Sequence, residues 1–219
     1  MLEFSNVVQN FDSSTDELIG KGHTPVQRKG VWAKEQFGNE NPIVLELACG
    51  RGEYTVALAK MYPDINFIGV DVKGARLWQG ARRLQEEGLI NGAFLRCRIE
   101  MLSKFFAMDE IDEIWITFPD PFLKQRKSSR RLTAAGFLDE YKRVLRPGGI
   151  IHLKTDELRL YDFTREVLAT YPSRTLYSSA DLYTTPDLDP RWSLTTHYEQ
   201  LHIADGDQIC GISFQLLAD

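Results

Sequence analysis

The stretch ELACGRGEYT, residues 46–55, decides the fold of this chain. An apolar run at residues 43–48 leads into its two glycines, and residues 53–61 follow with a helical pattern. This change of pattern predicts a buried strand that turns sharply into a helix. Glycine at such a turn allows a tight backbone and the close approach of a ligand. A strand–turn–helix unit of this type is where doubly wound folds bind nucleotides.

The same alternation continues toward the C-terminus. Strands are predicted at residues 66–71, 93–98, 113–118 and 150–154, and helices at 73–87, 137–145 and 156–170. Residues 174–179 and 208–217 predict two further strands with no helix between them, which indicates an antiparallel hairpin at the sheet edge. Repeated strand–helix units favour a parallel sheet with helices on both faces. We therefore expect a doubly wound α/β fold with a mostly parallel, seven-stranded, Rossmann-like sheet and a C-terminal antiparallel hairpin.

The whole chain fits one domain. It has 219 residues, which favours a single core. Residues 1–23 are expected to form a polar, flexible N-terminal segment, and residues 24–219 the domain, with a helix at 24–37. Residues 180–204 are too long for an idle loop and predict a functional insert. No apolar run approaches the ~18 residues of a membrane span.

Charge and cysteine content narrow the setting. The formal net charge of −5 means that any nucleic-acid surface must be a local basic patch. The three cysteines are widely spaced and odd in number, which favours reduced thiols, a cytoplasmic location and no metal cluster.

Asp71 ends the second predicted strand, 19 residues after Gly52. A carboxylate at this place can accept hydrogen bonds from both hydroxyls of a ribose, in NAD and in S-adenosylmethionine alike. Thr55 stands where a dinucleotide fingerprint requires a third glycine, and this disfavours a dehydrogenase. The alternative is that Gly50 and Gly52 only form a tight turn.

The second motif is ITFPDPFLK, residues 116–124, at the end of a predicted strand. Pro119 and Pro121 restrict the backbone around Asp120 and so fix where its side chain points. Ligands bind at the carboxyl ends of such strands, and a carboxylate there is stabilised by a ligand or a cation. The alternative is that Asp120 is a simple turn residue.

The third motif is a basic run at residues 124–131 that contains no acidic residue. Its cations are Lys124, Arg126, Lys127, Arg130 and Arg131. Phosphates of a polyanion are the natural partner of such a patch. The alternative is a solvated loop that serves solubility.

Together these motifs resemble the bacterial tRNA (guanine-N7)-methyltransferase family, from about Pro42 to the C-terminus. The most specific pieces are residues 118–122 with Lys124, residues 130–133, residues 154–156, and the sequence Thr-His-Tyr-Glu at 196–199 inside the predicted insert. The resemblance implies a class I methyltransferase that modifies tRNA in the cytoplasm. It implies S-adenosylmethionine as the cofactor and tRNA as the partner, with no membrane and no metal.

The resemblance also implies roles for individual residues. Those of the cofactor pocket would be Glu46, Gly50, Gly52, Asp71 and Asp120, with a backbone contact near Ile99 or Glu100. Those that hold the guanosine would be Lys124, Asp156, Thr196, Tyr198 and Glu199. Asp120 would also face the reacting guanine as the catalytic residue, or would only bind the cofactor. Either Asp156 or Glu199 would accept hydrogen bonds from the guanine.

The sequence departs from the family pattern at four places, and these departures weaken some of the residue roles assigned from the resemblance. Ala48 replaces a glycine, Phe122 replaces a tryptophan, and Gln200-Leu201 replace Arg-Phe. Arg98 stands where the family usually has Asn or Asp near the adenine, so no side-chain role is carried over to it.

Three alternatives remain open at this stage. An amine-directed nucleic-acid methyltransferase would use Asn/Asp-Pro-Pro-aromatic, and here the second proline is missing, because the order is Pro119-Asp120-Pro121-Phe122. A small-molecule methyltransferase fits the fold but leaves the basic run unexplained. A non-catalytic module that binds RNA or the cofactor is the third alternative.

Overall fold

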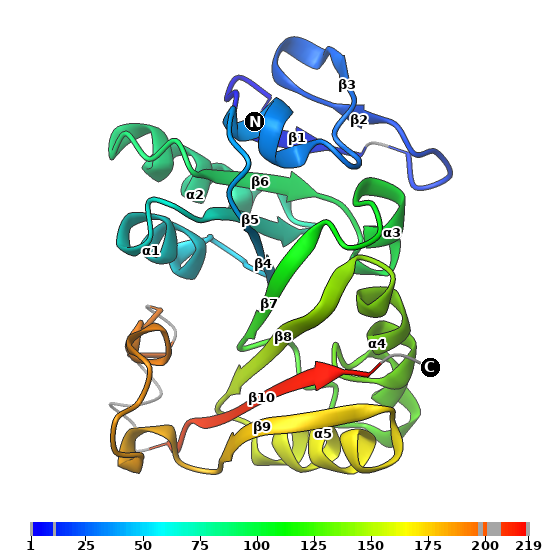
Figure 1. The fold of residues 1–219 in the computed structure, drawn as a ribbon, viewed down its shortest axis with the longest axis vertical. Helices are drawn as coiled ribbons and strands as arrows, with labels where there is room; N and C mark the ends of the chain where they lie inside the picture. Colours follow the sequence, from blue (N-terminus) through cyan, green and yellow to red (C-terminus); the bar gives the residue numbers. More distant parts are fainter. Residues whose placement is uncertain (1, 11, 197–198, 201–206, 218–219) are drawn as a thin grey trace.

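The computed structural model describes residues 2–10, 12–196, 199–200 and 207–217. These residues form a ten-stranded sheet in the order β3-β2-β1-β6-β5-β4-β7-β8-β10-β9 (Figure 1). Its centre consists of five parallel strands. They are β4 (Ile43–Leu47), β5 (Asn66–Asp71), β6 (Gly92–Arg96), β7 (Ile111–Thr117) and β8 (Leu145–Thr155). The expected α/β class with a mostly parallel sheet is confirmed.

Helices cover both faces of the sheet (Figure 1). α1 (Glu53–Met61) and α2 (Gly74–Glu86) pack on one face, and α3 (Leu102–Phe105), α4 (Ala135–Lys142) and α5 (Leu158–Thr170) pack on the other. In β7, Ile114 and Ile116 join one hydrophobic core, whereas Trp115 between them joins the other, and all three are fully buried. Burial on both faces explains why these strands are continuously apolar in sequence. Within the described ranges, no helix is long and apolar enough to cross a membrane.

The order of the strands reverses between β4 and β7. From β4, the chain first builds outward through β5 and β6, and then crosses back to place β7 on the other side of β4. Glu46 is in register with Trp115 and Leu47 with Ile116, so the two strands end at the same level. The β4–α1 turn and the loop after β7 are therefore neighbours, at the switch point where such sheets bind ligands.

The predicted C-terminal hairpin is present. It consists of β9 (Ser173–Ser179) and β10 (Cys210–Leu216), and β10 lies antiparallel between β9 and β8. The insert between them contains η5 (Leu182–Thr184) and η6 (Pro190–Ser193). Trp192 of η6 packs edge-on against Trp115 with ring centroids 4.8 Å apart. The insert therefore covers the face of the sheet that also carries α1 (Figure 1).

The sheet has ten strands rather than the expected seven. The three additional strands are β1 (Val7–Gln9), β2 (Leu18–Ile19) and β3 (Pro25–Val26), and β1 extends the parallel part by pairing with β6. Val7 and Val8 are buried, at 0% and 2% exposure. Strands of two or three residues within a polar segment are too short to show a period in sequence.

The helix expected at residues 24–37 is wrong. In addition to β3, this region holds η2 (Ala33–Phe37), a single π turn, and η1 (Lys21–His23) lies just before it. Glu110 pins the intervening loop, because its two carboxylate oxygens accept hydrogen bonds from the backbone N–H groups of Gly30 and Trp32 at 2.8 and 3.0 Å. These tertiary contacts, together with the positive φ of 78° at Gly30, override the local helical preference.

Candidate active site

A cavity of about 600 Å³ lies where β4 and β7 end. The residues predicted from sequence that line it are Glu46, Gly50, Asp120, Asp156 and Thr196. They come from the β4–α1 turn, the loop after β7, the residues before α5 and the insert, which are far apart along the chain. The volume falls within the range of roughly 300–1,000 Å³ that is typical of cofactor and small-ligand sites.

The β4–α1 turn contains three residues with positive φ. Ala48, Gly50 and Gly52 have φ values of 57°, 57° and 68°. A Cβ added at Gly52 would lie 2.3 Å from Cζ of Phe94, so close packing requires this glycine. A Cβ at Gly50 would meet no atom within 4 Å, which leaves open space beside the cavity. Ala48, which departs from the family pattern, occupies a left-handed conformation that favours glycine.

Glu46 is buried at the end of β4, with an exposure of 3%. Its Oε2 accepts hydrogen bonds from the backbone N–H of Thr55, at 2.8 Å, and from the Thr55 hydroxyl. Its Oε1 accepts one from the hydroxyl of Thr117 at 2.8 Å. Burial raises the pKa of the Glu46 carboxyl to about 7, although the hydrogen bonds from both threonines act to lower it. Its charge is therefore poised to respond to a cationic ligand.

Asp71 lies at the end of β5 and shapes the same turn. Its Oδ2 accepts a hydrogen bond from the backbone N–H of Gly50 at 3.0 Å, and its Oδ1 accepts one from that of Lys73 at 2.8 Å. It is not among the residues that line the cavity. The carboxylate thus holds the glycine turn in place, and each oxygen keeps acceptor capacity for a ribose hydroxyl.

Ile99 and Glu100, expected near the adenine, begin η3 (Ile99–Met101). Ile99 belongs to the hydrophobic core, with 9% exposure. Glu100 is exposed and forms an ion pair of 3.2 Å with Arg98. Neither residue lines the cavity.

The loop that carries Asp120 is held at both ends. The backbone N–H of Phe118 donates to the carbonyl of Lys154 at 2.8 Å. Arg131 donates to the carbonyls of Pro121 and Phe122 at 3.0 and 3.2 Å. Phe118 and Phe122 have positive φ values of 47° and 41°. Backbone strain of this kind persists where the surroundings fix it, and it is concentrated at functional sites.

The basic run divides into two groups. Lys124, Arg126 and Arg130 are exposed and Lys127 is half-buried, on or beside η4 (Gln125–Arg130). Arg131 is buried at 5% exposure, where its guanidinium supports the loop after β7 and lies 4.3 Å from the ring centroid of Phe163. Only the first group presents its charge to solvent beside the cavity.

The last group of predicted residues comes from the insert. Thr196 lines the cavity. Glu199 is fully buried and forms an ion pair of 2.6 Å with Lys154 at the end of β8. Tyr198 lies outside the described residues, so its contacts are not described.

Two kinds of residue escaped the prediction from sequence. Arg51 and Arg76 line the cavity, although Arg51 received no role within the motif at residues 46–55 and Arg76 belongs to no motif selected above. Lys154 was part of a family motif but received no role. A lysine that ends a strand of apolar residues, as in Ile150–Lys154, was the signal that could have indicated a buried cation.

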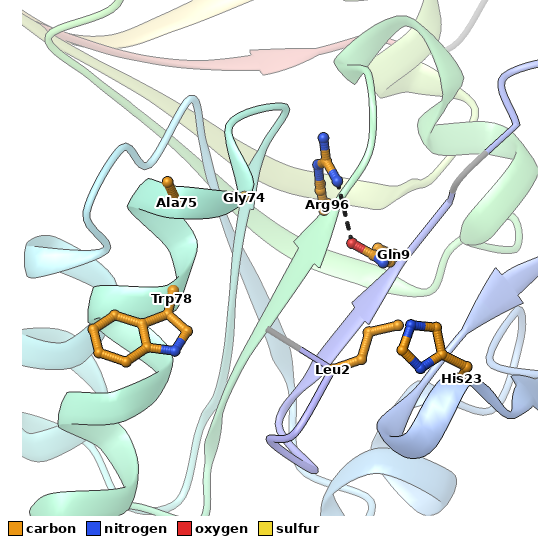
Figure 2. A pocket seen from close by; sticks show the side chains of 7 residues that line it. All are labelled: Leu2, Gln9, His23, Gly74, Ala75, Trp78 and Arg96. Carbon is orange, nitrogen blue, oxygen red and sulfur yellow. Dashed lines mark hydrogen bonds between the residues drawn. The ribbon is translucent and has the colours of Figure 1, made fainter.

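A second cavity, of about 450 Å³, lies beside α2 and the ends of β1 and β6 (Figure 2). Trp78 lines one side of it, and on the other Nη1 of Arg96 donates a hydrogen bond of 3.4 Å to the amide oxygen of Gln9. None of the residues predicted from sequence lines this cavity.

The first cavity fits S-adenosylmethionine in its chemistry. The buried carboxylate of Glu46 matches an ammonium or sulfonium cation. The carboxylate of Asp71 does not line the cavity, but it holds the glycine turn beside it and has acceptor capacity for a ribose diol. The open space at Gly50 leaves the turn accessible to a ligand. These residues of β4, β5 and the glycine turn would hold the cofactor.

Comparison with known proteins supports this assignment. A family model described as "Putative methyltransferase" matches residues 40–211. The chain is 43% identical over 217 residues to the tRNA (guanine-N(7)-)-methyltransferase of Christiangramia forsetii, which covers 98% of this chain and 93% of the relative. It is 48% identical over 189 residues to the protein of the same name from Porphyromonas gingivalis, which covers 86% of this chain and 77% of the relative.

Solved structures share the fold at low sequence identity. The 16S rRNA methyltransferase KamB aligns with a TM-score of 0.65 and 12% identity, covering 90% of this chain and 98% of that one. A SAM dependent methyltransferase from Aquifex aeolicus aligns with a TM-score of 0.56 and 16% identity, covering 85% and 88%. These likenesses establish a Rossmann-like methyltransferase fold.

Proposed function

We propose that this chain, which belongs to the tRNA (guanine-N(7)-)-methyltransferase family, transfers the methyl group of S-adenosylmethionine to N7 of a guanine in tRNA. The observation that carries the proposal is the meeting of two groups of residues in one cavity. Glu46 and Gly50, which suit the cofactor, come from β4 and the turn after it. Asp120, Asp156 and Thr196, which suit the guanosine, come from the segments after β7 and β8 and from the insert.

Methyl transfer to guanine N7 requires no proton transfer by the protein. When bound, S-adenosylmethionine supplies a methyl group on a sulfonium, and as the lone pair of N7 forms the new N–C bond, the S–C bond breaks and its electron pair returns to sulfur. Guanine N7 carries no proton near neutral pH, so no general base is required. The protein must align the two reactants and exclude water, which is a large source of rate enhancement.

Asp120 is proposed as the catalytic residue. It lines the cavity in a loop that is fixed by Pro119 and Pro121 and by the contacts of Arg131 with the same loop. Positive charge moves from sulfur to the purine ring during transfer. A negative side chain held beside that path stabilises the transition state electrostatically.

The guanosine is proposed to lie between Asp156, Thr196 and Glu199, with Lys124 at its entrance. Carboxylates recognise the N–H groups of nucleobases by accepting hydrogen bonds. Asp156 lines the cavity, and Oε2 of Glu199 is a buried oxygen with no hydrogen-bond partner among the described residues. The carboxylate oxygens of these two residues are hydrogen-bond acceptors, which suit the N1–H and the exocyclic amine of guanine as donors. Tyr198 is retained from the family pattern alone.

The exposed cations Lys124, Arg126, Lys127 and Arg130 are proposed to contact the RNA backbone. They lie just beyond Asp120 in the chain and present a local positive surface on a protein with a net charge of −5. Phosphate contacts of this kind position an RNA without reading its sequence.

The direct test is incubation of the purified protein with methyl-labelled S-adenosylmethionine and an unmodified tRNA, followed by digestion and nucleoside analysis. We expect the label in 7-methylguanosine. Label in another nucleoside, or in a small molecule with RNA left unlabelled, would require a different methyltransferase activity. Cofactor or RNA binding without any label would indicate a non-catalytic module.

A further inference from the structure

Lys154 is a fully buried lysine next to the end of β8, and among the described residues the ion pair and the hydrogen bonds of its ammonium group all go to one segment. Its Nζ lies 2.6 Å from Oε1 of Glu199, with which it forms an ion pair. It also donates to the carbonyls of Trp192 and Leu194 at 2.6 and 2.9 Å, and to the hydroxyl of Tyr183 at 3.4 Å. All four partners belong to the insert between β9 and β10.

A buried ammonium is costly unless its charge and its donors are satisfied. Here the carboxylate of Glu199 supplies the opposite charge, and the two backbone carbonyls accept the remaining N–H bonds. Burial lowers the pKa of Lys154, while the charge and hydrogen bond of Glu199 act to raise it. The ion pair therefore holds the insert in place, because breaking it would leave an unpaired charge in the interior of the protein.

The contacts of Lys154 bracket Thr196. The carbonyls of Trp192 and Leu194 precede Thr196 in sequence, and Glu199 follows it. Thr196 is tied to the same turn, because its Oγ1 accepts a hydrogen bond from the backbone N–H of Glu199 at 3.1 Å. One buried side chain thus fixes the backbone on both sides of the residue that faces the cavity.

The other end of this stretch has its own anchor. Arg191 forms ion pairs with Glu113 of β7 at 2.6 Å and with Asp189 at 2.7 Å. Its backbone carbonyl accepts a hydrogen bond from the hydroxyl of Tyr54. Because this anchor does not depend on Lys154, loss of Lys154 should release residues 194–196 and Glu199 while η6 stays on the sheet.

We propose that Lys154 is a positioning residue for the guanosine: it holds Glu199 and the backbone around Thr196 in the arrangement that receives the base. The inference rests on the proposed function. The pairing leaves Oε2 of Glu199 buried and without a hydrogen-bond partner among the described residues, while Thr196 in the same turn lines the cavity. Lys154 acts through Glu199 and Thr196 and does not itself touch the substrate.

The test compares Lys154→Met with the wild-type protein. Amide hydrogen exchange should accelerate in residues 194–196 and at Glu199, and remain unchanged in the rest of the described chain. The single-turnover rate at saturating tRNA should fall by about tenfold or more, because small displacements of a reactant are costly in rate. Cofactor affinity, measured by calorimetry, should stay within about twofold of wild type, because Lys154 makes no contact with Glu46 or the glycine turn among its ion pair and hydrogen bonds.

Lys60→Met is the matched control. It removes an exposed lysine that pairs with Glu87 at 3.1 Å, on α1 and away from the insert. It should change neither the exchange pattern of the insert nor the rate.

If Lys154→Met leaves Glu199 as an unpaired buried charge and does not fold, the double variant Lys154→Met/Glu199→Gln removes both charges together. Its reference is Glu199→Gln, and exchange in residues 194–196 and at position 199 should be faster in the double variant. Unchanged exchange in a folded variant, or an unchanged rate at saturating tRNA, would overturn the positioning role. If the wild-type protein fails to methylate tRNA, the proposed function is wrong. The exchange measurement still tests whether Lys154 holds the insert in place.

Discussion

The carboxylate of Glu46 accepts a hydrogen bond of 2.8 Å from the hydroxyl of Thr117, which joins the ends of β4 and β7 at the cavity. The two strands carry the two sequence motifs that indicate a ligand site, and this contact connects them. Glu46 is also the group whose pKa is raised by burial to about 7. Its ionisation is therefore coupled to whatever charge the cavity receives.

The first prediction concerns the release of protons from Glu46 when the cofactor binds. A cationic ligand favours the ionised carboxylate, so binding of S-adenosylmethionine should lower the pKa of Glu46 and release about half a proton near pH 7. Calorimetry in buffers of different ionisation enthalpy measures this release. The Glu46→Gln variant should bind with no release from this site. Equal proton release in both proteins would show that the cofactor charge does not reach Glu46.

The same group should affect stability in a defined direction. Because its folded-state pKa of about 7 lies above the usual 4.5, protonated Glu46 favours the folded state at low pH. That contribution is lost as the pH rises from 4.5 through about 7, and the free energy of unfolding of the unliganded protein should fall over this pH range. Urea titrations of wild type and Glu46→Gln across this range check the sign.

The second prediction concerns Ala48, whose φ is 57°. A left-handed conformation costs a residue with a Cβ roughly 1–2 kcal/mol, and glycine loses roughly 0.5–1 kcal/mol through its greater freedom when unfolded. Ala48→Gly should therefore raise the free energy of unfolding, by up to about 1.5 kcal/mol. Ala57→Gly in the middle of α1 is the matched control and should lower it by about 0.5–1 kcal/mol. A loss of stability in Ala48→Gly would contradict the conformational argument.

The third prediction concerns the basic run. Each phosphate contact contributes about −0.7 to −0.9 to the slope of log affinity against log salt. Replacing Arg126, Lys127 and Arg130 by Ala should flatten this slope for tRNA and leave cofactor affinity unchanged. A wild-type slope in the triple variant would assign the run to a solvated loop.

A triple control separates a local contact from a change in net charge. Lys60, Arg82 and Arg165 are exposed cations outside the run, each in an ion pair with a nearby carboxylate. Replacing these three by Ala changes the net charge equally and should leave the slope near that of wild type. Arg131 is excluded from the test set because it is buried and supports the loop after β7.

The fourth prediction separates catalysis from binding at Asp120. Asp120→Asn keeps the shape of the side chain and removes its charge, so the single-turnover rate should fall by about 10²–10³ while tRNA affinity changes little. Asp64→Asn, at an exposed position between α1 and β5, is the control and should be fully active. Full recovery of the Asp120→Asn rate at saturating cofactor would leave Asp120 as a binding residue only.

Much of the fold could be predicted because the sheet is buried on both faces. β5 and α1 have the predicted boundaries, Asn66–Asp71 and Glu53–Met61, since continuous apolar strands and a glycine turn leave a clear pattern. The N-terminal strands could not be predicted, because β1 is fixed by pairing with β6, far along the chain, and β2 and β3 only extend the sheet from β1. The helix expected at residues 24–37 was wrong for the same reason, since Glu110 determines that loop from far along the sequence.

The site was predictable where a motif follows a strand end. Glu46, Gly50, Asp120 and Asp156 lie where parallel strands end, so one cavity gathers them. Partners within the insert were not predictable, because the burial of Lys154 against Glu199 depends on how a long irregular segment packs. The basic run shows a similar limit, since nothing in its composition distinguishes the buried Arg131 from its exposed neighbours.

The measurement that most directly tests the central claim uses two tRNA transcripts of one sequence, one natural and one with 7-deazaguanosine in place of guanosine. The replacement exchanges N7 for a carbon and retains the groups that pair with other bases. With labelled S-adenosylmethionine, we expect 7-methylguanosine in the natural transcript and no label in the substituted one, with both transcripts bound. Label in the substituted transcript would contradict transfer to N7.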